Sequence, residues 1–257
     1  MSSSFQDLII KEFERNELLY KDCLGEALEE YATLLLSENK KYNLTRITTP
    51  EDIVNKHFID SILGFEKFLE NRSSKNSFHI MDVGSGAGFP GIPLLLYDQI
   101  CKDNQLIDKM DLLDSNRKKT EFLGLIKPKI ARRVNRDLIE IHNSRLENLV
   151  LRKNPPNLYV SRATGKISNV LNFLEKFIKK NFNDVVPKEG QIYLLYYGGP
   201  DSVVLPKKEG RSFKLSRKAT CRLHRQARNV YEYQFSSSKY LRKNVLYVIT
   251  NKITFDD

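Results

Sequence analysis

The chain has 257 residues, of which 40% are hydrophobic and 29% charged. These proportions are typical of a globular protein and exclude a disordered or fibrous chain. The length fits one large domain, or one domain with an appendage. We expect no membrane span and no secretory signal, because no apolar run is long enough for either. Three widely spaced cysteines form no disulfide framework, which favours a cytoplasmic setting.

The formal net charge is +10, and the positive charge is clustered. Residues 116–136 and 207–228 are rich in lysine and arginine and contain few acids. Clustering favours a polyanionic partner, although a generally basic composition would also explain the net charge. We therefore predict phosphate contacts for one set of residues: Lys118, Lys119, Arg132, Arg133, Arg217, Lys218, Arg222 and Arg225.

The first part of the chain reads as helical. Residues 5–37 carry apolar side chains at helical spacing, which predicts two helices. Thr49 is the expected N-cap of a further helix, because a proline and two acids follow it. A polar stretch at 70–77 then resembles a linker. We predict that residues 1–70 form an N-terminal helical extension and that residues 71–257 form the main domain.

From residue 78 the pattern changes to strands that alternate with helices. The expected strands are FHIMDV, KMDLLD, LIEIHN, LYVSRA and QIYLLYY. Two later runs, VYEYQF and NVLYVITNKI, are expected to pair as a hairpin at one edge. Repeated strand–helix units imply an α/β fold with a mostly parallel, doubly wound sheet.

The first of these strands leads into a glycine-rich turn at residues 82–91, DVGSGAGFPG. Such a turn lets the backbone approach a ligand, and the next helix presents free N–H groups to it. The spacing GAGFPG at 86–91 fits a dinucleotide, whereas DVGSGAG at 82–88 fits S-adenosylmethionine. A tight strand–helix turn without a ligand is the third interpretation.

Two acids flank this turn. Asp82 ends the first strand, where a carboxylate needs either backbone amides or a polar ligand to be satisfied. Asp114 ends the next strand, where it can accept both hydroxyls of a ribose. A nicotinamide cofactor also carries a ribose, so Asp114 alone does not distinguish the two ligands.

Six blocks of sequence then follow one another in a characteristic order: NKKYNLT (39–45), KHFIDSI (56–62), DVGSGAGFPGIPL (82–94), LLDSNRKKTEFL (112–123), NSRLENL (143–149) and SRA (161–163). Together they resemble the bacterial 16S ribosomal RNA 7-methylguanosine methyltransferase family, also called glucose-inhibited division protein B. The resemblance implies a class I, Rossmann-like methyltransferase fold with S-adenosylmethionine as the methyl donor. It also implies methylation of N7 of one guanine in the decoding-region loop of 16S RNA.

By position, the resemblance implies a cofactor site made of Gly84, Phe89, Asp114, Leu146, Glu147 and Arg162. Leu146 and Glu147 would supply an apolar wall and a backbone amide for an adenine ring. Arg162 suits the methionine carboxylate or an RNA phosphate, because it would repel the sulfonium. The sequence identifies no metal ligand and no catalytic acid or base.

Other positions have two interpretations each. His57 and Asp60 lie on one helical face, either as a pair that fixes the N-terminal helices or as a polar cluster beside the substrate. Asn43 is a turn residue by its chemistry and a substrate contact by resemblance. Where the family usually closes its fifth strand with lysine and glycine, this chain has Tyr196 and Tyr197 before a glycine.

We therefore predict an S-adenosylmethionine-dependent methyltransferase that acts on guanine N7 in 16S ribosomal RNA or in the small-subunit particle. We expect a monomer in the cytoplasm, with no membrane contact. One alternative is a diverged homologue that binds RNA without transferring methyl groups. The other is a nicotinamide-dependent oxidoreductase, for which no acid–base set is evident.

Overall fold

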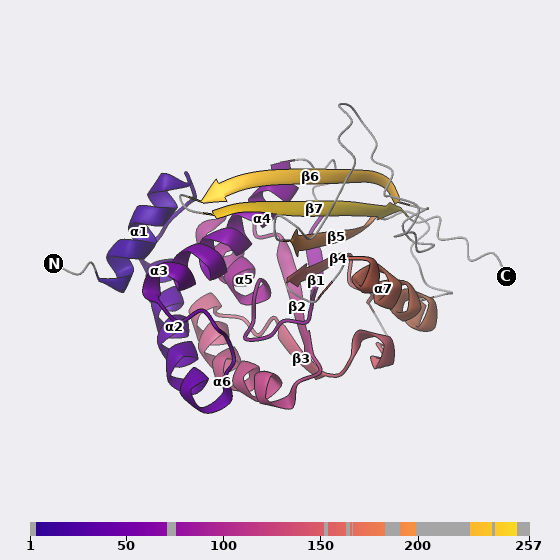
Figure 1. Cartoon of the computed structure of the whole chain (residues 1–257), viewed down its shortest axis with the longest axis horizontal. Helices are drawn as coiled ribbons and strands as arrows, with labels where there is room; N and C mark the ends of the chain where they lie inside the picture. The colour runs from indigo at the N-terminus through magenta and orange to yellow at the C-terminus, as the bar shows by residue number, and fades with distance from the viewer. Residues whose placement is uncertain are drawn as a thin grey trace.

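Figure 1 shows a computed structural model of the chain, which describes residues 4–70, 76–151, 154–162, 165, 167–182, 191–198, 227–237 and 240–250. Within these ranges the strands form one sheet of order β3-β2-β1-β4-β5-β7-β6. The strands are β1 (Phe78–Val83), β2 (Ile107–Asp114), β3 (Ile139–Asn143), β4 (Leu158–Arg162), β5 (Gln191–Gly198), β6 (Ala227–Ser237) and β7 (Tyr240–Thr250).

Strands β1 to β5 are parallel, and β7 pairs antiparallel with both β5 and β6. The predicted edge hairpin is confirmed, with β7 inserted between β5 and β6. The predicted doubly wound sheet is confirmed as well. The strand order reverses between β1 and β4: β2 and β3 lie on one side of β1, and β4 and β5 lie on the other. In such sheets, ligands bind at this reversal, beyond the carboxyl ends of the strands.

The helices are α1 (Phe5–Arg15), α2 (Asp22–Tyr42), α3 (Pro50–Asp52), the π-helical η1 (Ile53–Ile59), α4 (Asp60–Glu70), α5 (Gly91–Cys101), α6 (Arg117–Val134), the 3-10 helix η2 (Leu146–Asn148) and α7 (Ile167–Phe182). The cap predicted at Thr49 is confirmed, because its Oγ1 accepts a hydrogen bond from the Asp52 N–H at 3.3 Å. The helix expected after it consists of α3, η1 and α4 in succession. In its π-helical middle, the Lys56 carbonyl accepts a hydrogen bond from Arg162 at 2.7 Å.

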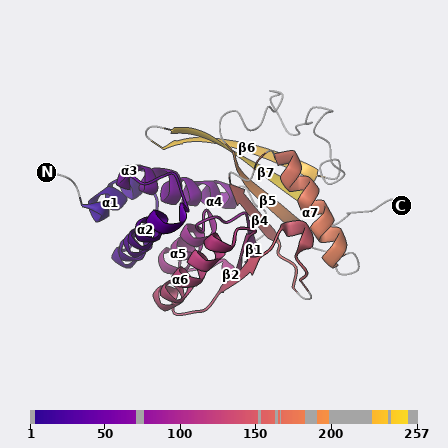
Figure 2. The same ribbon diagram turned by 60° about the horizontal axis from the view of Figure 1, so that its bottom comes forward.

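The helices form layers on both sides of the sheet (Figure 2), with α7 on the side opposite α5 and α6. One core joins the N-terminal helices to the sheet and includes Phe58 and Leu112. The second core lies under α7 and includes Leu171. The N-terminal helices thus share a core with the main sheet, and the division into 1–70 and 71–257 stays a prediction.

Ion pairs join α2 to α6. Glu30 lies 2.9 Å from Lys129, 3.2 Å from Arg132 and 3.1 Å from Arg133, and Glu26 lies 2.8 Å from Arg133. The hydrogen bond from Lys129 lowers the pKa of Glu30. We expect Arg132 and Arg133 to contact phosphate, and in the structure both side chains also pair with glutamates of α2. The phosphate contacts stay a prediction.

None of the helices in the described ranges has both the length and the apolar character that crossing a bilayer requires.

Candidate functional site

A cavity of about 490 Å³ lies at the carboxyl ends of β1, β2 and β4, where the strand order reverses. Its walls come from the glycine turn, the strand ends, η2, α7 and the segment before α3. The structure brings all six residues of the implied cofactor site into this one lining: Gly84, Phe89, Asp114, Leu146, Glu147 and Arg162. Their individual roles stay predictions.

The glycine turn after β1 has a backbone shape that other residues would strain. Gly86 has φ +61° and Gly88 has φ +101°, both in the left-handed region. A Cβ at Gly88 would lie 2.4 Å from Cδ1 of Ile92 and 2.8 Å from the Tyr31 hydroxyl. The turn therefore needs glycine for both its conformation and its space.

Asp114 connects this turn to the end of β2. Its Oδ2 accepts a hydrogen bond from the Gly86 N–H at 2.9 Å, and its Oδ1 accepts one from the Asn116 N–H at 2.8 Å. Each carboxylate oxygen has a second lone pair, so both can also accept a ligand hydroxyl. Lys119 Nζ lies 3.7 Å from Oδ2. The structure thus holds an ionisable acceptor in a fixed position at the cavity.

Asp82 has a structural role. It is fully buried, it does not line the cavity, and its Oδ2 accepts a hydrogen bond from the Gly91 N–H at 2.9 Å. A backbone amide rather than a ligand therefore satisfies this oxygen. Burial raises the pKa of Asp82 to about 7, although the hydrogen bond from Gly91 works in the opposite direction. Asp82 fastens β1 to the first residue of α5.

Phe89 lies between two other rings at the opposite end of the turn. The His57 ring stacks on it with centroids 3.9 Å apart and planes 4° apart. Tyr31 stacks on it with centroids 5.2 Å apart. Helix α2 and the π-helix thereby contact the glycine turn directly, which explains why the N-terminal helices belong to the site.

Arg162 holds the same helices from the end of β4. Its Nη1 donates to the Lys56 carbonyl at 2.7 Å, to Asp60 at 3.2 Å and to Ser61 at 3.4 Å. Its Nη2 lies 2.6 Å from Nδ1 of His57. Both interpretations of His57 and Asp60 therefore have support, because the pair fixes the N-terminal helices and His57 also lines the cavity. The protein contacts of Arg162 favour a positioning role over the carboxylate or phosphate contact that we expected.

Three further lining residues lie outside the predicted cofactor set. Thr45, Lys119 and Phe173 line the cavity, and Phe173 is 39% exposed. They come from a loop, from α6 and from α7, and only the folded chain brings them together. Asn43, which we considered as a substrate contact, caps α2 with φ 52° and is not among the lining residues.

The two tyrosines at the end of β5 pack inside the protein. Tyr197 donates a hydrogen bond to the Ser61 carbonyl at 2.7 Å, and Tyr196 donates one to the Gly165 carbonyl. Neither lines the cavity. At these positions, where the chain departs from the family pattern, the side chains contribute to packing around β5 and not to the cavity wall.

Comparison with known proteins gives the family of the chain. The model of the GidB family, described as rRNA small subunit methyltransferase G, matches residues 25–191, which is more than half of the chain. The chain belongs to this family. The match includes the glycine turn, Asp114, η2 and Arg162, and it ends at the start of β5.

Relatives and solved structures agree with membership in the GidB family. A ribosomal RNA small subunit methyltransferase G of Mesoplasma florum is 35% identical over 173 residues, which cover 64% of this chain and 66% of that protein. The match thus spans slightly less than two thirds of that relative. A protein of the same name from Carboxydothermus hydrogenoformans is 30% identical and covers 85% of this chain and 80% of its own length.

The fold is that of class I methyltransferases. The structure of the O-methyltransferase TomG from Streptomyces achromogenes, in complex with SAM, matches with a TM-score of 0.52 at 12% identity. The match covers 93% of this chain and 94% of TomG. At this level of identity the likeness concerns the fold alone.

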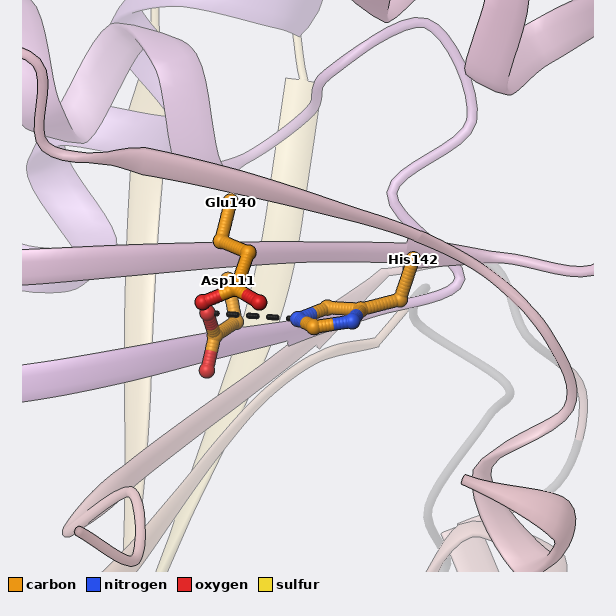
Figure 3. Close-up of side chains that lie close together, drawn as sticks. All are labelled: Asp111, Glu140 and His142. Atoms are coloured by element: carbon orange, nitrogen blue, oxygen red, sulfur yellow. Dashed lines mark ion pairs between the residues drawn. The ribbon is translucent and has the colours of Figure 1, made fainter. Parts of the chain in front are cut away.

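A second cluster of polar side chains lies on β2 and β3 (Figure 3), where Asp111, Glu140 and His142 offer ligand atoms within 4.8 Å of one another. The Lys109 ammonium lies 3.3 Å from Asp111 and 2.6 Å from Glu140, so the protein itself balances these charges. Burial works to raise the pKa of Asp111, but the imidazoles of His142 and His79, 3.3 and 2.6 Å away, hold it well below its usual range. The cluster does not line the cavity, and we interpret it as an ion-pair network within the sheet.

The buried Asp82 predicts a pH-dependent stability. Its folded-state pKa of about 7 lies above the unfolded value, so the folded chain binds the extra proton and stability falls as the pH rises from about 4 through 7. Asp82→Asn keeps an acceptor for the Gly91 N–H and has no charge to bury. The stability of the wild-type chain relative to the variant should fall by up to about 4 kcal/mol across this range. Urea unfolding at several pH values measures the difference, and parallel curves would contradict the role of Asp82.

Proposed function

We propose that this GidB-family chain transfers a methyl group from S-adenosylmethionine to N7 of a guanine in 16S ribosomal RNA. The observation that carries the proposal is the single cavity in which Asp114, the glycine turn and η2 meet at the sheet reversal. The family and the relatives named as ribosomal RNA small subunit methyltransferase G support the choice of reaction.

The residues present fit S-adenosylmethionine. Asp114 offers two fixed acceptors for the ribose hydroxyls, and Leu146 offers an apolar wall for the adenine. The glycine turn leaves backbone close to the space between them. When bound, S-adenosylmethionine supplies an electrophilic methyl group.

The methyl transfer needs no general acid or base from the protein. Guanine N7 carries a lone pair and no proton, so no general base is needed to activate it. His57, the imidazole at the cavity, contacts Arg162 and Thr45 through its two nitrogens, which suits positioning better than proton transfer. The contribution of the protein is then alignment of the two reactants and exclusion of water.

The substrate we infer is 16S RNA or the small-subunit particle, bound by a monomer in the cytoplasm. Lys118 and Lys119 lie in the first turn of α6, where Lys119 lines the cavity, and both remain our candidates for phosphate contacts. Four further candidates lie outside the described residues: Arg217, Lys218, Arg222 and Arg225.

Binding of the methyl donor tests the cofactor assignment. Asp114→Ala should weaken binding of S-adenosylhomocysteine about 10- to 100-fold, because it removes one or two hydrogen bonds to a charged acceptor. Asp137→Ala is the matched control, since Asp137 forms a surface ion pair with Lys127 and does not line the cavity. Titration calorimetry measures both variants. Tight binding of NADH, with no binding of S-adenosylmethionine or S-adenosylhomocysteine, would overturn the assignment.

The salt dependence of RNA binding tests the basic surface. Replacing Lys118 and Lys119 together by glutamine should flatten the slope of log K against log salt by about 1 to 2, because each phosphate contact contributes roughly 0.7 to 0.9. Replacing Arg132 and Arg133 by glutamine is the comparison, since both side chains form ion pairs with glutamates of α2. Filter binding of 16S RNA fragments at increasing salt gives both slopes. Equal slopes for the two double variants would contradict the assignment to Lys118 and Lys119.

A further inference from the structure

We propose that the Thr45 hydroxyl donates a hydrogen bond to O6 of the target guanine and so selects guanine over adenine. The proposal rests on the proposed function, because it assigns the base-recognition part of the same cavity. It stands on the hydrogen-bond directions around Thr45, on the way this residue is held and on its place in the cavity.

The strand order places Thr45 at the substrate end of the cavity. Asp114 ends β2 and Leu146 follows β3, and these strands lie on one side of β1, whereas Arg162 ends β4 on the other side. If the ribose and the adenine occupy the end with Asp114 and Leu146, the target base enters at the end with Arg162. Thr45 and His57 line that end, since both belong to the network that Arg162 anchors.

Arg162 determines which atom donates and which accepts in each hydrogen bond from Arg162 through His57 to Thr45. The guanidinium of Arg162 is always protonated and has no acceptor, so Nδ1 of His57 must accept from it at 2.6 Å. The ring proton of His57 then lies on Nε2, which donates to Thr45 Oγ1 at 3.1 Å. The Ile47 N–H donates to the same oxygen at 3.1 Å.

Both lone pairs of the Thr45 oxygen are therefore occupied, and the hydroxyl can act only as a donor. Among the described residues, the structure shows no hydrogen bond that this hydroxyl donates. The donors Arg162, His57 and Thr45 point one after another along the chain of bonds, and such alignment strengthens the last donor. A polarised O–H group at a cavity wall fits a carbonyl oxygen of the ligand.

Thr45 is also held firmly in place. The side chain of Asn39 accepts from the Thr45 N–H at 2.8 Å and donates to the Thr45 carbonyl at 3.0 Å. The residue is thus fixed through its backbone by α2 and through its side chain by His57. A donor held in this way loses little entropy when the base binds.

Guanine is the purine that matches such a donor. Its exposed edge presents two acceptors, N7 and O6, whereas adenine presents N7 and an N6 amino donor. N7 needs its lone pair for the methyl group, so the hydroxyl must bond to O6. Adenine would bring a donor against a donor, and sites that leave a buried polar group unpaired reject the wrong ligand strongly. A bond to O6 also brings the neighbouring N7 into position.

Substitution in both the protein and the base tests the contact. The substrate is small-subunit RNA with guanine, inosine or 2-aminopurine at the nucleotide that the wild-type chain methylates; inosine keeps O6, and 2-aminopurine lacks it but keeps N7. Thr45→Val should lower kcat/KM about 10- to 100-fold with guanine and with inosine. It should have little further effect with 2-aminopurine, which has no O6 bond to lose. Thr45→Ser retains the hydroxyl and should retain the preference for guanine over 2-aminopurine.

The possible outcomes separate this proposal from the proposed function. Equal losses with all three bases would mean that Thr45→Val acts through the fold, and the O6 contact would be wrong. An unchanged rate with guanine would overturn the contact as well. If the wild-type chain transfers no methyl group to any guanine of the RNA, the proposed function fails and the Thr45 contact fails with it.

Discussion

The side chain of Arg162 is only 8% exposed, and its guanidinium therefore carries a buried positive charge. The arrangement of the cavity depends on the groups that pair with this charge. Burying a cation is costly unless a counter-charge and several acceptors surround it. Asp60, which is 2% exposed, supplies the counter-charge, and the π-helix supplies a carbonyl and an imidazole nitrogen. The end of β4 is thereby fastened to the N-terminal helices, and neither partner can leave without exposing or stranding a charge.

This constraint divides the work of the site between two parts of the chain. The sheet and its turns hold the region that suits the cofactor, through Asp114, the glycine turn and η2. The N-terminal helices hold the other region, through His57, Thr45 and the stacked ring of Phe89. The N-terminal helices therefore form part of the cavity wall. The hydrophobic core that they share with the sheet fixes the positions of the two regions relative to each other.

The sequence predicts the features that depend on local or periodic patterns. The strands from residue 78 onwards, the cap at Thr49 and the glycine turn all follow from short-range rules, and the structure confirms them. The contacts of Arg162 with His57 and of Arg133 with Glu30 join residues more than a hundred positions apart. No spacing rule reaches across that distance. For the same reason the sequence does not assign Thr45 to the site, although Thr45 closes the block NKKYNLT: its hydrogen bond to His57 is a tertiary contact.

The central claim is that this chain methylates N7 of one guanine in 16S ribosomal RNA, and the modification itself can be mapped. Small-subunit RNA is isolated from cells with the gene, without it, and with it restored. Reduction followed by aniline cleavage then locates each 7-methylguanosine. We expect one cleavage site in 16S RNA that is present in cells with the gene, absent in cells without it, and present again when the gene is restored. An identical cleavage pattern in all three samples would contradict the account.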